Sequence, residues 1–285
     1  MINNKSTYNF LTFDIEEWFH ANFLGVNLED YSELSTDLEK NVDRLIAVCA
    51  EINVYSTCFI LGSVAENKPQ IVKKLYMAGH EIASHGYNHK LVYTMTGDEF
   101  RKDLQKSCTI IENITGEKVL GYRAPSWSVK KENLPWFYTI LEEAGLKYSS
   151  SVYPAHTFLY GIPCFTRKVH YPVINGKKIN VLEMPVPVVS LLGKYLGFSG
   201  GFYLRFLPVW FINRTIRNFN YKSEPVFIYL HPREIDVKQP KLKLPVFEDF
   251  IHYWGINSCE KKLRKILISL SGKIVRIRDS LNKTL

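Results

Sequence analysis

Residues 8–17 read YNFLTFDIEE, an apolar run that ends in acidic residues. The part from Tyr8 to Ile15 predicts a buried β-strand. Side chains repeat every two residues along a strand, so Asp14 and Glu16 should point the same way at its end. Two carboxylates placed together can divide the roles of metal ligand and general base. A strand end whose acids are simply solvated is the plainer explanation.

The chain continues with alternating strand-like and helix-like patterns, which favour a parallel sheet, either open or closed into a barrel. The expected strands are 8–15, 55–61, 81–84, 119–122, 148–153, 181–189 and 226–230. The expected helices are one capped by Ser35 or Thr36 that runs to about residue 52, and 64–78, 96–116, 134–144, 208–218 and 260–270.

Three more polar clusters follow predicted strands, at residues 85–89, 123–126 and 231–234. In α/β folds the chemistry sits at the C-terminal ends of the strands, which is where all the clusters would lie. His85 and His89 are spaced so that both can reach one metal ion, and neutral imidazole is a common ligand for zinc and related ions. Arg123 could hold a carboxylate, and His231 could act as a general acid. Each cluster alone also fits a structural role, but together they indicate a metal-dependent hydrolase.

The bulk composition argues against several other classes of protein, such as nucleic-acid-binding, disulfide-rich and secreted ones. The net charge of +8 comes mostly from singly spread Lys and Arg residues, with local density at 167–168, 177–178 and 261–283. We expect a solvated basic surface and no nucleic-acid partner, with contact to an acidic polymer or to a membrane face as the alternative. Five unclustered cysteines argue against a disulfide framework. Acidic residues interrupt the first apolar run, so no signal peptide is expected and the expected location is the cytoplasm.

The order and spacing of the polar clusters resemble those of the polysaccharide deacetylase family, the NodB-homology proteins of carbohydrate esterase family 4. The closer match is to a subgroup of exopolysaccharide gene clusters, often exosortase-linked, with patterns such as Phe-Asp-Val-Glu-Asp-Tyr-Phe, Ala-Ser-His-Gly-Tyr-x-His, Arg-Ala-Pro-Ser-Phe-Ser and His-Pro-Trp-Glu-Ile-Asp. The corresponding stretches here are 13–19, 83–89, 123–128 and 231–236. The resemblance extends over roughly residues 8–270.

The resemblance implies an α/β fold, a distorted (β/α) barrel of about seven parallel strands. One deacetylase domain would span residues 1–285, with a core at about 8–235 and a less regular C-terminal extension at about 236–285. The implied reaction removes N-acetyl groups from an amino-sugar polysaccharide or a lipid-linked precursor and releases acetate. The implied partner is this glycan or lipid-linked saccharide. The implied cofactor is a divalent metal ion, with zinc expected and cobalt or nickel as alternatives.

The resemblance also implies residue roles. Asp14 would be the general base, oriented by Arg123, and His231 would protonate the leaving amine. The implied metal ligands are Glu16, His85 and His89. A backbone N–H, that of Tyr153 by analogy, would help to hold the oxyanion. The residues expected to line the substrate cleft are Trp18, Pro125, Trp127 and Tyr153, although core packing would equally explain the aromatic ones.

Three departures from the family pattern bear on the site. The metal-binding acid is Glu rather than Asp, and Glu17 competes with Glu16 for that role. Ser149 stands where the subgroup has Asp, and Arg233 replaces a Trp. Two other functions stay open: a related C–N hydrolase acting on small amides or ureides, and an inactive glycan-binding relative.

Overall fold

The computed structural model describes residues 7–22, 30, 32–34, 37–157, 161–191 and 193–281. Its main sheet has the strand order β11-β1-β2-β3-β4-β5-β8, and every described register between neighbours in it is parallel. All seven predicted strands contribute to it, which confirms the predicted α/β class of a distorted (β/α) barrel. The strands are Phe10–Ile15 (β1), Thr57–Ile60 (β2), Glu81–Ser84 (β3), Gly121–Tyr122 (β4), Tyr148–Ser149 (β5), Leu182–Glu183 (β8) and Phe227–Leu230 (β11).

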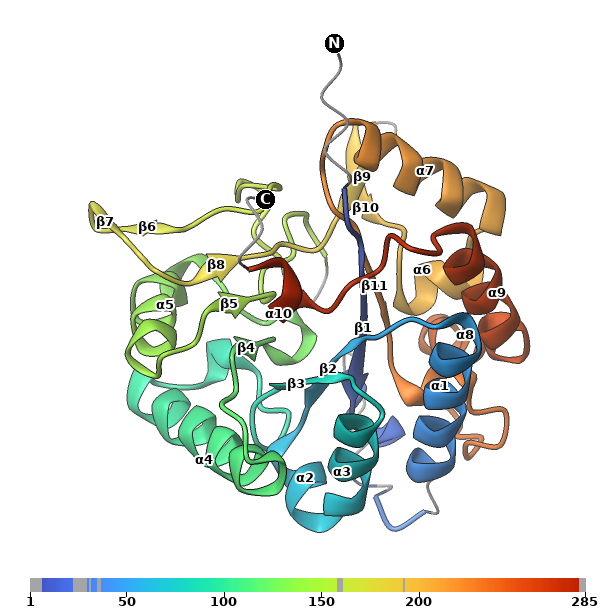
Figure 1. Cartoon of the computed structure of the whole chain (residues 1–285), viewed down its shortest axis with the longest axis horizontal. Helices are drawn as coiled ribbons and strands as arrows, with labels where there is room; N and C mark the ends of the chain where they lie inside the picture. Colours follow the sequence, from blue (N-terminus) through green and yellow to red (C-terminus); the bar gives the residue numbers. More distant parts are fainter. Residues whose placement is uncertain are drawn as a thin grey trace. The chain divides into compact units, whose positions relative to one another are not determined.

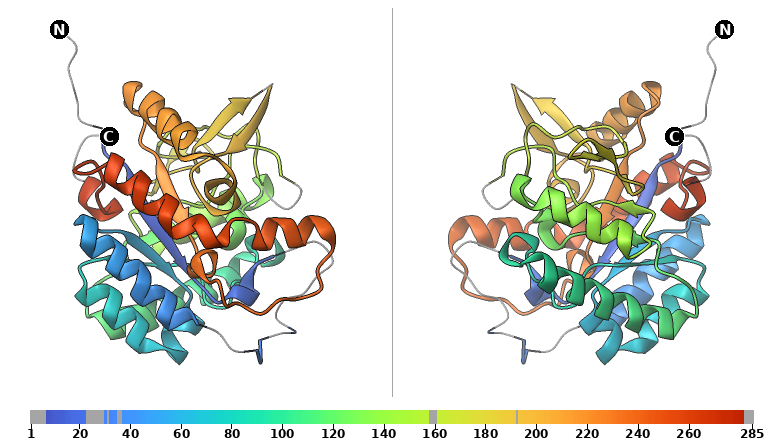
Figure 2. Two further views of the ribbon diagram at one scale, coloured as in Figure 1. Left: turned by 90° about the vertical axis from the view of Figure 1, so that its right-hand side faces the viewer. Right: turned by 90° about the vertical axis from the view of Figure 1, so that its left-hand side faces the viewer.

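The chain divides into two compact units, residues 1–57 with 197–280 and residues 58–196 with 281–285. In the first unit, β1 and β11 are buried along their whole length, as strands covered on both faces are. Helices α1 and α9 lie side by side (Figure 2), joined by an ion pair of 2.6 Å between Arg44 Nη2 and Glu260 Oε2. The helices of this unit are Leu38–Ile52 (α1), Gly201–Phe206 (α6), Val209–Tyr221 (α7), Val246–Tyr253 (α8), Ile256–Ser269 (α9) and Ile277–Ser280 (α10). The expected caps of α1, Ser35 and Thr36, lie outside the described residues.

In the second unit, four helices pack against one another, and two of them, α3 and α4, cover β3 (Figure 1). They are Gly62–Asn67 (α2), Pro69–Met77 (α3), Gly97–Thr115 (α4) and Leu134–Glu143 (α5). Two small strand pairs, Val173–Ile174 (β6) with Lys177–Lys178 (β7) and Val188–Leu191 (β9) with Lys194–Gly197 (β10), lie outside the main sheet.

Several predicted boundaries are wrong, including that of the strand expected at 148–153, which ends at Ser149. The expected helix 64–78 is two helices, because Pro69 has no N–H to donate and a new helix begins there. The expected strand 181–189 is split into β8 and β9, and Pro185 and Pro187 lie between them. The expected helix 260–270 begins earlier, at Ile256.

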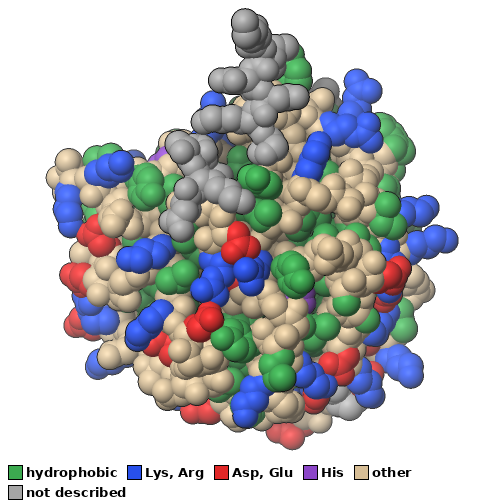
Figure 3. Space-filling view, viewed as in Figure 1, with side chains coloured by type: hydrophobic (Ala, Val, Ile, Leu, Met, Phe, Trp, Pro, Cys, Tyr) green, Lys and Arg blue, Asp and Glu red, His purple; other side chains and the backbone are tan. Residues whose placement is uncertain are grey.

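The cysteines agree with the expectation from composition, and Figure 3 shows how charges are distributed on one face of the molecule. On the face drawn in Figure 3, Lys and Arg side chains are dispersed among acidic ones rather than gathered into one patch. All five cysteines are free, and Cys49, Cys58 and Cys259 are buried. In the part of the chain that the structure describes, no helix combines the length and the apolar character needed to cross a bilayer.

Candidate active site

Two carboxylates and an imidazole come together at the C-terminal ends of β1 and β11 in the first unit. The parallel register pairs Phe13 with Leu230, so the residues that follow, Asp14 and His231, leave the sheet as neighbours. Nε2 of His231 lies 3.7 Å from Oδ2 of Asp14 and 3.8 Å from Oε1 of Glu16. Both carboxylates are buried, so this edge concentrates ionisable groups where charge interactions are strong.

The other ring nitrogen of His231 faces Glu234. Nδ1 of His231 lies 3.5 Å from Oε2 of Glu234, which also accepts the backbone N–H of His231 at 3.3 Å. Burial opposes protonation of His231, but the negative charges of Glu16 and Glu234 outweigh it and raise the pKa of His231. Burial acts in the opposite direction on Glu234 and by itself would raise the pKa of this carboxyl. The hydrogen bond and charge of His231 and the charge of Arg205 outweigh it and bring the pKa of Glu234 down to about 2.

Arg205, on α6, contacts the carboxylate oxygen of Glu234 that does not face His231. Its Nε lies 3.4 Å from Oε1 of Glu234, and both side chains are fully buried. The guanidinium also donates to the carbonyl oxygens of Ile251, His252 and Trp254 at the end of α8. A buried cation with an anion and three carbonyls around it is well compensated, and it ties the surroundings of Glu234 to α8.

The two predicted metal-ligating histidines lie close together in the second unit, directly after β3. The ring centroids of His85 and His89 are 5.5 Å apart. The turn between them depends on Gly86, whose φ of +79° is in the region that favours glycine. The N–H of Tyr87 donates to Oδ2 of Asp103 at 2.9 Å, which fixes the middle of the turn. The segment is therefore held to α4 by this hydrogen bond.

Arg123 and a run of serines connect β4 to β5 in the same unit. Nδ1 of His85 lies 2.8 Å from the carbonyl oxygen of Arg123, a contact that assigns the proton to Nδ1 and leaves Nε2 for a ligand. The Arg123 guanidinium is buried over the ring of Phe59, 4.1 Å from its centroid, and donates to Ser150 Oγ at 3.3 Å. Ser151 Oγ accepts the N–H of Ala124 at 3.0 Å.

Glu183, on β8, was missed by sequence reasoning. Its Oε1 accepts the N–H groups of Ser151 and Val152, each at 3.0 Å, and so fixes the segment that leads from β5 to Tyr153. The side chain is fully buried, and this burial raises the pKa of Glu183 to about 7. Only its place as an acidic residue within the apolar strand predicted at 181–189 could have drawn attention to it. Ser149, which replaces the expected Asp, donates to Ser151 Oγ at 2.8 Å in the same network.

The donor atoms available for a metal fit the predicted ligand set. Glu16, His85 and His89 are buried, and each offers one ligand atom in a group that could hold a metal ion. Glu17 is not a member of that group. Two imidazoles and one carboxylate with an open position form a donor set found in catalytic zinc sites. The residues present therefore fit a divalent metal.

The four residues expected to line the cleft are all buried: Trp18, Pro125, Trp127 and Tyr153. Within the second unit, the rings of Trp127 and Tyr153 pack on each other with centroids 6.1 Å apart. Burial of this degree favours the packing role for these rings over an exposed platform for sugars.

Comparison with known proteins identifies the family. The polysaccharide deacetylase family model matches residues 4–149, and a model described as a domain of unknown function (DUF3473) matches residues 150–276. The first match covers half of the chain, which therefore belongs to the polysaccharide deacetylase family, as predicted. The exopolysaccharide subgroup stays a prediction.

Individual relatives agree with this family. A peptidoglycan deacetylase from Helicobacter pylori is 24% identical over 232 residues, 75% of this chain and 71% of the relative. The crystal structure of a putative polysaccharide deacetylase from Mycobacterium smegmatis has a TM-score of 0.64 at 18% identity, covering 99% of this chain and 91% of the other. A CE4 family pseudoenzyme from Bacillus anthracis has a TM-score of 0.53 at 15% identity, covering 99% and 67%. The two structures share the fold.

Proposed function

We propose that this protein is a metal-dependent hydrolase that removes N-acetyl groups from an amino-sugar glycan and releases acetate. The observation that carries the proposal is the buried group at the ends of β1 and β11, where one nitrogen of His231 faces Asp14 and Glu16 and the other faces Glu234. An acid, a base and a ligand side chain in such proximity have no evident use in a protein that only binds. Membership of the deacetylase family supports the same conclusion.

The chain's own residues would divide the proton transfers. Asp14 would take a proton from the attacking water, since an ionised carboxylate at a strand end can act as a general base. His231 would give a proton from Nε2 to the nitrogen that leaves, while Glu234 holds Nδ1. Arg123 would orient Asp14, as the family resemblance suggests. The segment fixed by Glu183 would present the backbone N–H of Tyr153 to the oxyanion.

Glu16, His85 and His89 would hold the divalent ion. When bound, the ion would lower the pKa of water and polarise the amide carbonyl. Zinc is the metal that this donor set favours, and cobalt or nickel could substitute. The hydrogen bond from His85 Nδ1 to the carbonyl of Arg123 supports this assignment, because metal-bound histidines usually have their second nitrogen engaged in this way.

The substrate class follows from the relatives. Several are named as peptidoglycan deacetylases, so an N-acetylated glycan polymer or its lipid-linked precursor is the substrate that we infer. The motif register over residues 13–19 and 231–236 supports an exopolysaccharide rather than peptidoglycan as the polymer.

The test is acetate release from N-acetylglucosamine oligomers by protein that is stripped of metal and then supplied with zinc, cobalt or nickel. Small amides and ureides serve as comparison substrates. We expect acetate from the sugars only when metal is present. Failure to bind metal, together with no acetate from any N-acetylated sugar, would overturn the proposal. Glycan binding without turnover would instead indicate an inactive relative.

A further inference from the structure

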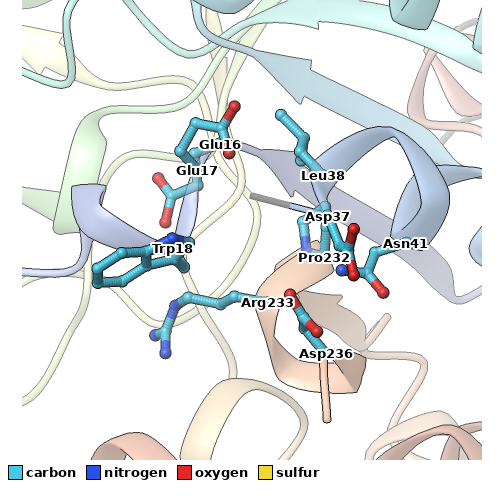
Figure 4. A pocket seen from close by; sticks show the side chains of 9 residues that line it. All are labelled: Glu16, Glu17, Trp18, Asp37, Leu38, Asn41, Pro232, Arg233 and Asp236. Carbon is cyan, nitrogen blue, oxygen red and sulfur yellow. The ribbon is translucent and has the colours of Figure 1, made fainter. Parts of the chain in front are cut away.

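A small pocket, partly open to solvent, lies beside Glu16 in the first unit (Figure 4). Trp18 and Arg233 line it from the two segments that follow β1 and β11. Its enclosed space is far smaller than that of a pocket that takes a whole small molecule, so no more than one substituent of a sugar could enter it. Because Glu16 is a proposed metal ligand, that substituent would belong to a molecule bound at the reaction site.

Two hydrogen-bond donors of this pocket have no acceptor. Nε1 of Trp18 and Nε of Arg233 are both buried and make no hydrogen bond with any residue that the structure describes. Only 2% of the Trp18 surface is exposed. Indole and guanidinium groups can donate but cannot accept. A buried donor without a partner costs about 1–3 kcal/mol, so two of them on one pocket indicate a ligand that brings acceptors.

Arg233 acts on Glu234 through its charge, which helps to lower the pKa of that carboxyl, but it is not held by a close ion pair among the described residues. Among the described residues, no carboxylate forms an ion pair with its guanidinium. The acids that line the pocket have other partners: Asp37 pairs with Lys40 at 2.6 Å, and Asp236 accepts the N–H of Lys238 at 2.9 Å. Figure 4 shows the guanidinium turned away from Asp236, on the side of Trp18. Arg233 is therefore not there to neutralise these acids.

We propose that this pocket is a subsite for an anionic substituent, a carboxylate or a phosphate, of the glycan, with Arg233 and Trp18 as its donors. The inference rests on the proposed function for the identity of the ligand as a glycan. The planar guanidinium fork matches two anionic oxygens, and the indole N–H supplies a third donor. Arg233 replaces the Trp that the subgroup pattern has at this position, so the substitution adds positive charge to the lining of this pocket.

The experiment measures binding rather than turnover, on the Asp14→Asn protein in buffer with zinc, by titration calorimetry. One probe pair is a tetrasaccharide of alternating N-acetylglucosamine and glucuronate and the same molecule with its carboxylates reduced. The other pair is N-acetylglucosamine 1-phosphate and N-acetylglucosamine. The pair that shows the larger ratio of dissociation constants identifies the anion.

We expect the anionic member of one pair to bind about tenfold to a hundredfold more tightly, as a charged hydrogen bond allows. Arg233→Gln should abolish this ratio, and Trp18→Phe, which keeps the ring and removes the N–H, should reduce it. Lys238→Gln is the matched control, because it removes a neighbouring exposed cation that does not line the pocket, and its ratio should equal that of the parent protein.

Equal binding of both members in both pairs would overturn the inference, and so would a ratio that survives Arg233→Gln in protein that still unfolds cooperatively. These results are separate from the proposed reaction. A preference that depends on Arg233 without acetate release by the unmodified protein would sustain the subsite and refute the deacetylase. Acetate release without such a preference would sustain the deacetylase and refute the subsite.

Discussion

The two sets of candidate site residues are held in place by different chemistry. At the ends of β1 and β11, the contacts are between charged groups, with Glu234 placed between His231 and Arg205. After β3 and β4, most contacts are neutral, formed by main-chain groups, serine hydroxyls and imidazole, with Arg123 as the main charged side chain.

The difference predicts how each region responds to change. Removing one member of a buried charged cluster leaves its partners uncompensated, which costs about 3–5 kcal/mol. Removing one neutral hydrogen bond costs about 1 kcal/mol. The two regions should also respond to pH in opposite directions, because His252 in the first unit is held neutral by burial and by nearby cations, whereas burial in the second unit favours protonated Glu183.

The largest expected effect is that of Glu234→Gln. The substitution removes the negative charge between Arg205 and His231, so the free energy of unfolding should fall by about 3–5 kcal/mol in urea denaturation. Glu248→Gln, a change on α8 outside the cluster, should alter it by less than about 0.5 kcal/mol. If Glu234→Gln costs as little as Glu248→Gln, the charged cluster is not what holds this region.

The second effect is the loss of stability as the pH rises through the pKa of Glu183. The pKa of Glu183 is about 7, against 4.5 for its usual value, so the stability from its protonated form is present below pH 4.5 and is lost as pH rises to 7. Glu183→Gln keeps an acceptor for the N–H groups of Ser151 and Val152 and escapes this loss. Relative to the unsubstituted protein, its free energy of unfolding should therefore rise by about 3 kcal/mol between pH 4.5 and 8.

Urea denaturation at a series of pH values measures that difference. Tyr93→Phe is a control for the measurement, since it changes a titratable group of the same unit outside the Glu183 network. A difference between Glu183→Gln and the unsubstituted protein that stays constant from pH 4.5 to 8 would mean that folding does not raise the pKa of Glu183.

The third effect has the opposite sign and concerns His252. Burial first, and then the charges of Arg233 and Arg205, lower the pKa of His252 to about 2 from 6.5. The stability from its neutral form is present above pH 6.5 and is lost as pH falls, at about 1.4 kcal/mol per pH unit. The measurement is the free energy of unfolding by chemical denaturation at several pH values between 6.5 and 4.5. In His252→Gln, the fall of this free energy per pH unit should be smaller than in the unsubstituted protein by about this amount. An unchanged slope would contradict the assignment.

The smallest effect is that of Ser151→Ala, which removes the acceptor of the Ala124 N–H. The free energy of unfolding should fall by about 2 kcal/mol, because two neutral hydrogen bonds are lost, those that Ser151 Oγ accepts from the Ala124 N–H and from Ser149 Oγ. Thr139→Ala, at an exposed hydroxyl on α5, should change it by less than about 0.5 kcal/mol. A loss from Ser151→Ala as large as that from Glu234→Gln would remove the contrast between the two regions.

Much of the fold could be predicted because parallel strands buried on both faces leave continuous apolar runs in the sequence, as residues 10–15 and 227–230 do. The errors arose where local chemistry overrides the pattern. Pro69 divides an apolar helical run into α2 and α3, and the short strand β8 ends two residues before Pro185.

The site was predictable to the extent that its residues follow strands in recognisable clusters. Asp14, His85, Arg123 and His231 were found in this way, and Glu16 follows from the alternation along β1. Glu183 and Arg205 could not be found, because their roles depend on contacts between segments distant in sequence, such as Arg205 with residues 251–254. No local pattern distinguishes a buried Arg on α6 from an exposed one.

The most direct test of the central claim compares bound zinc and released acetate in the same samples of the unsubstituted protein and Asp14→Asn. Both proteins should bind one zinc ion, because Asp14 is not a member of the group formed by Glu16, His85 and His89. Only the unsubstituted protein should release acetate from N-acetylglucosamine oligomers at an appreciable rate, since loss of a general base lowers the rate about 10²–10⁴-fold. Equal turnover by both proteins, or no zinc in either, would contradict the account.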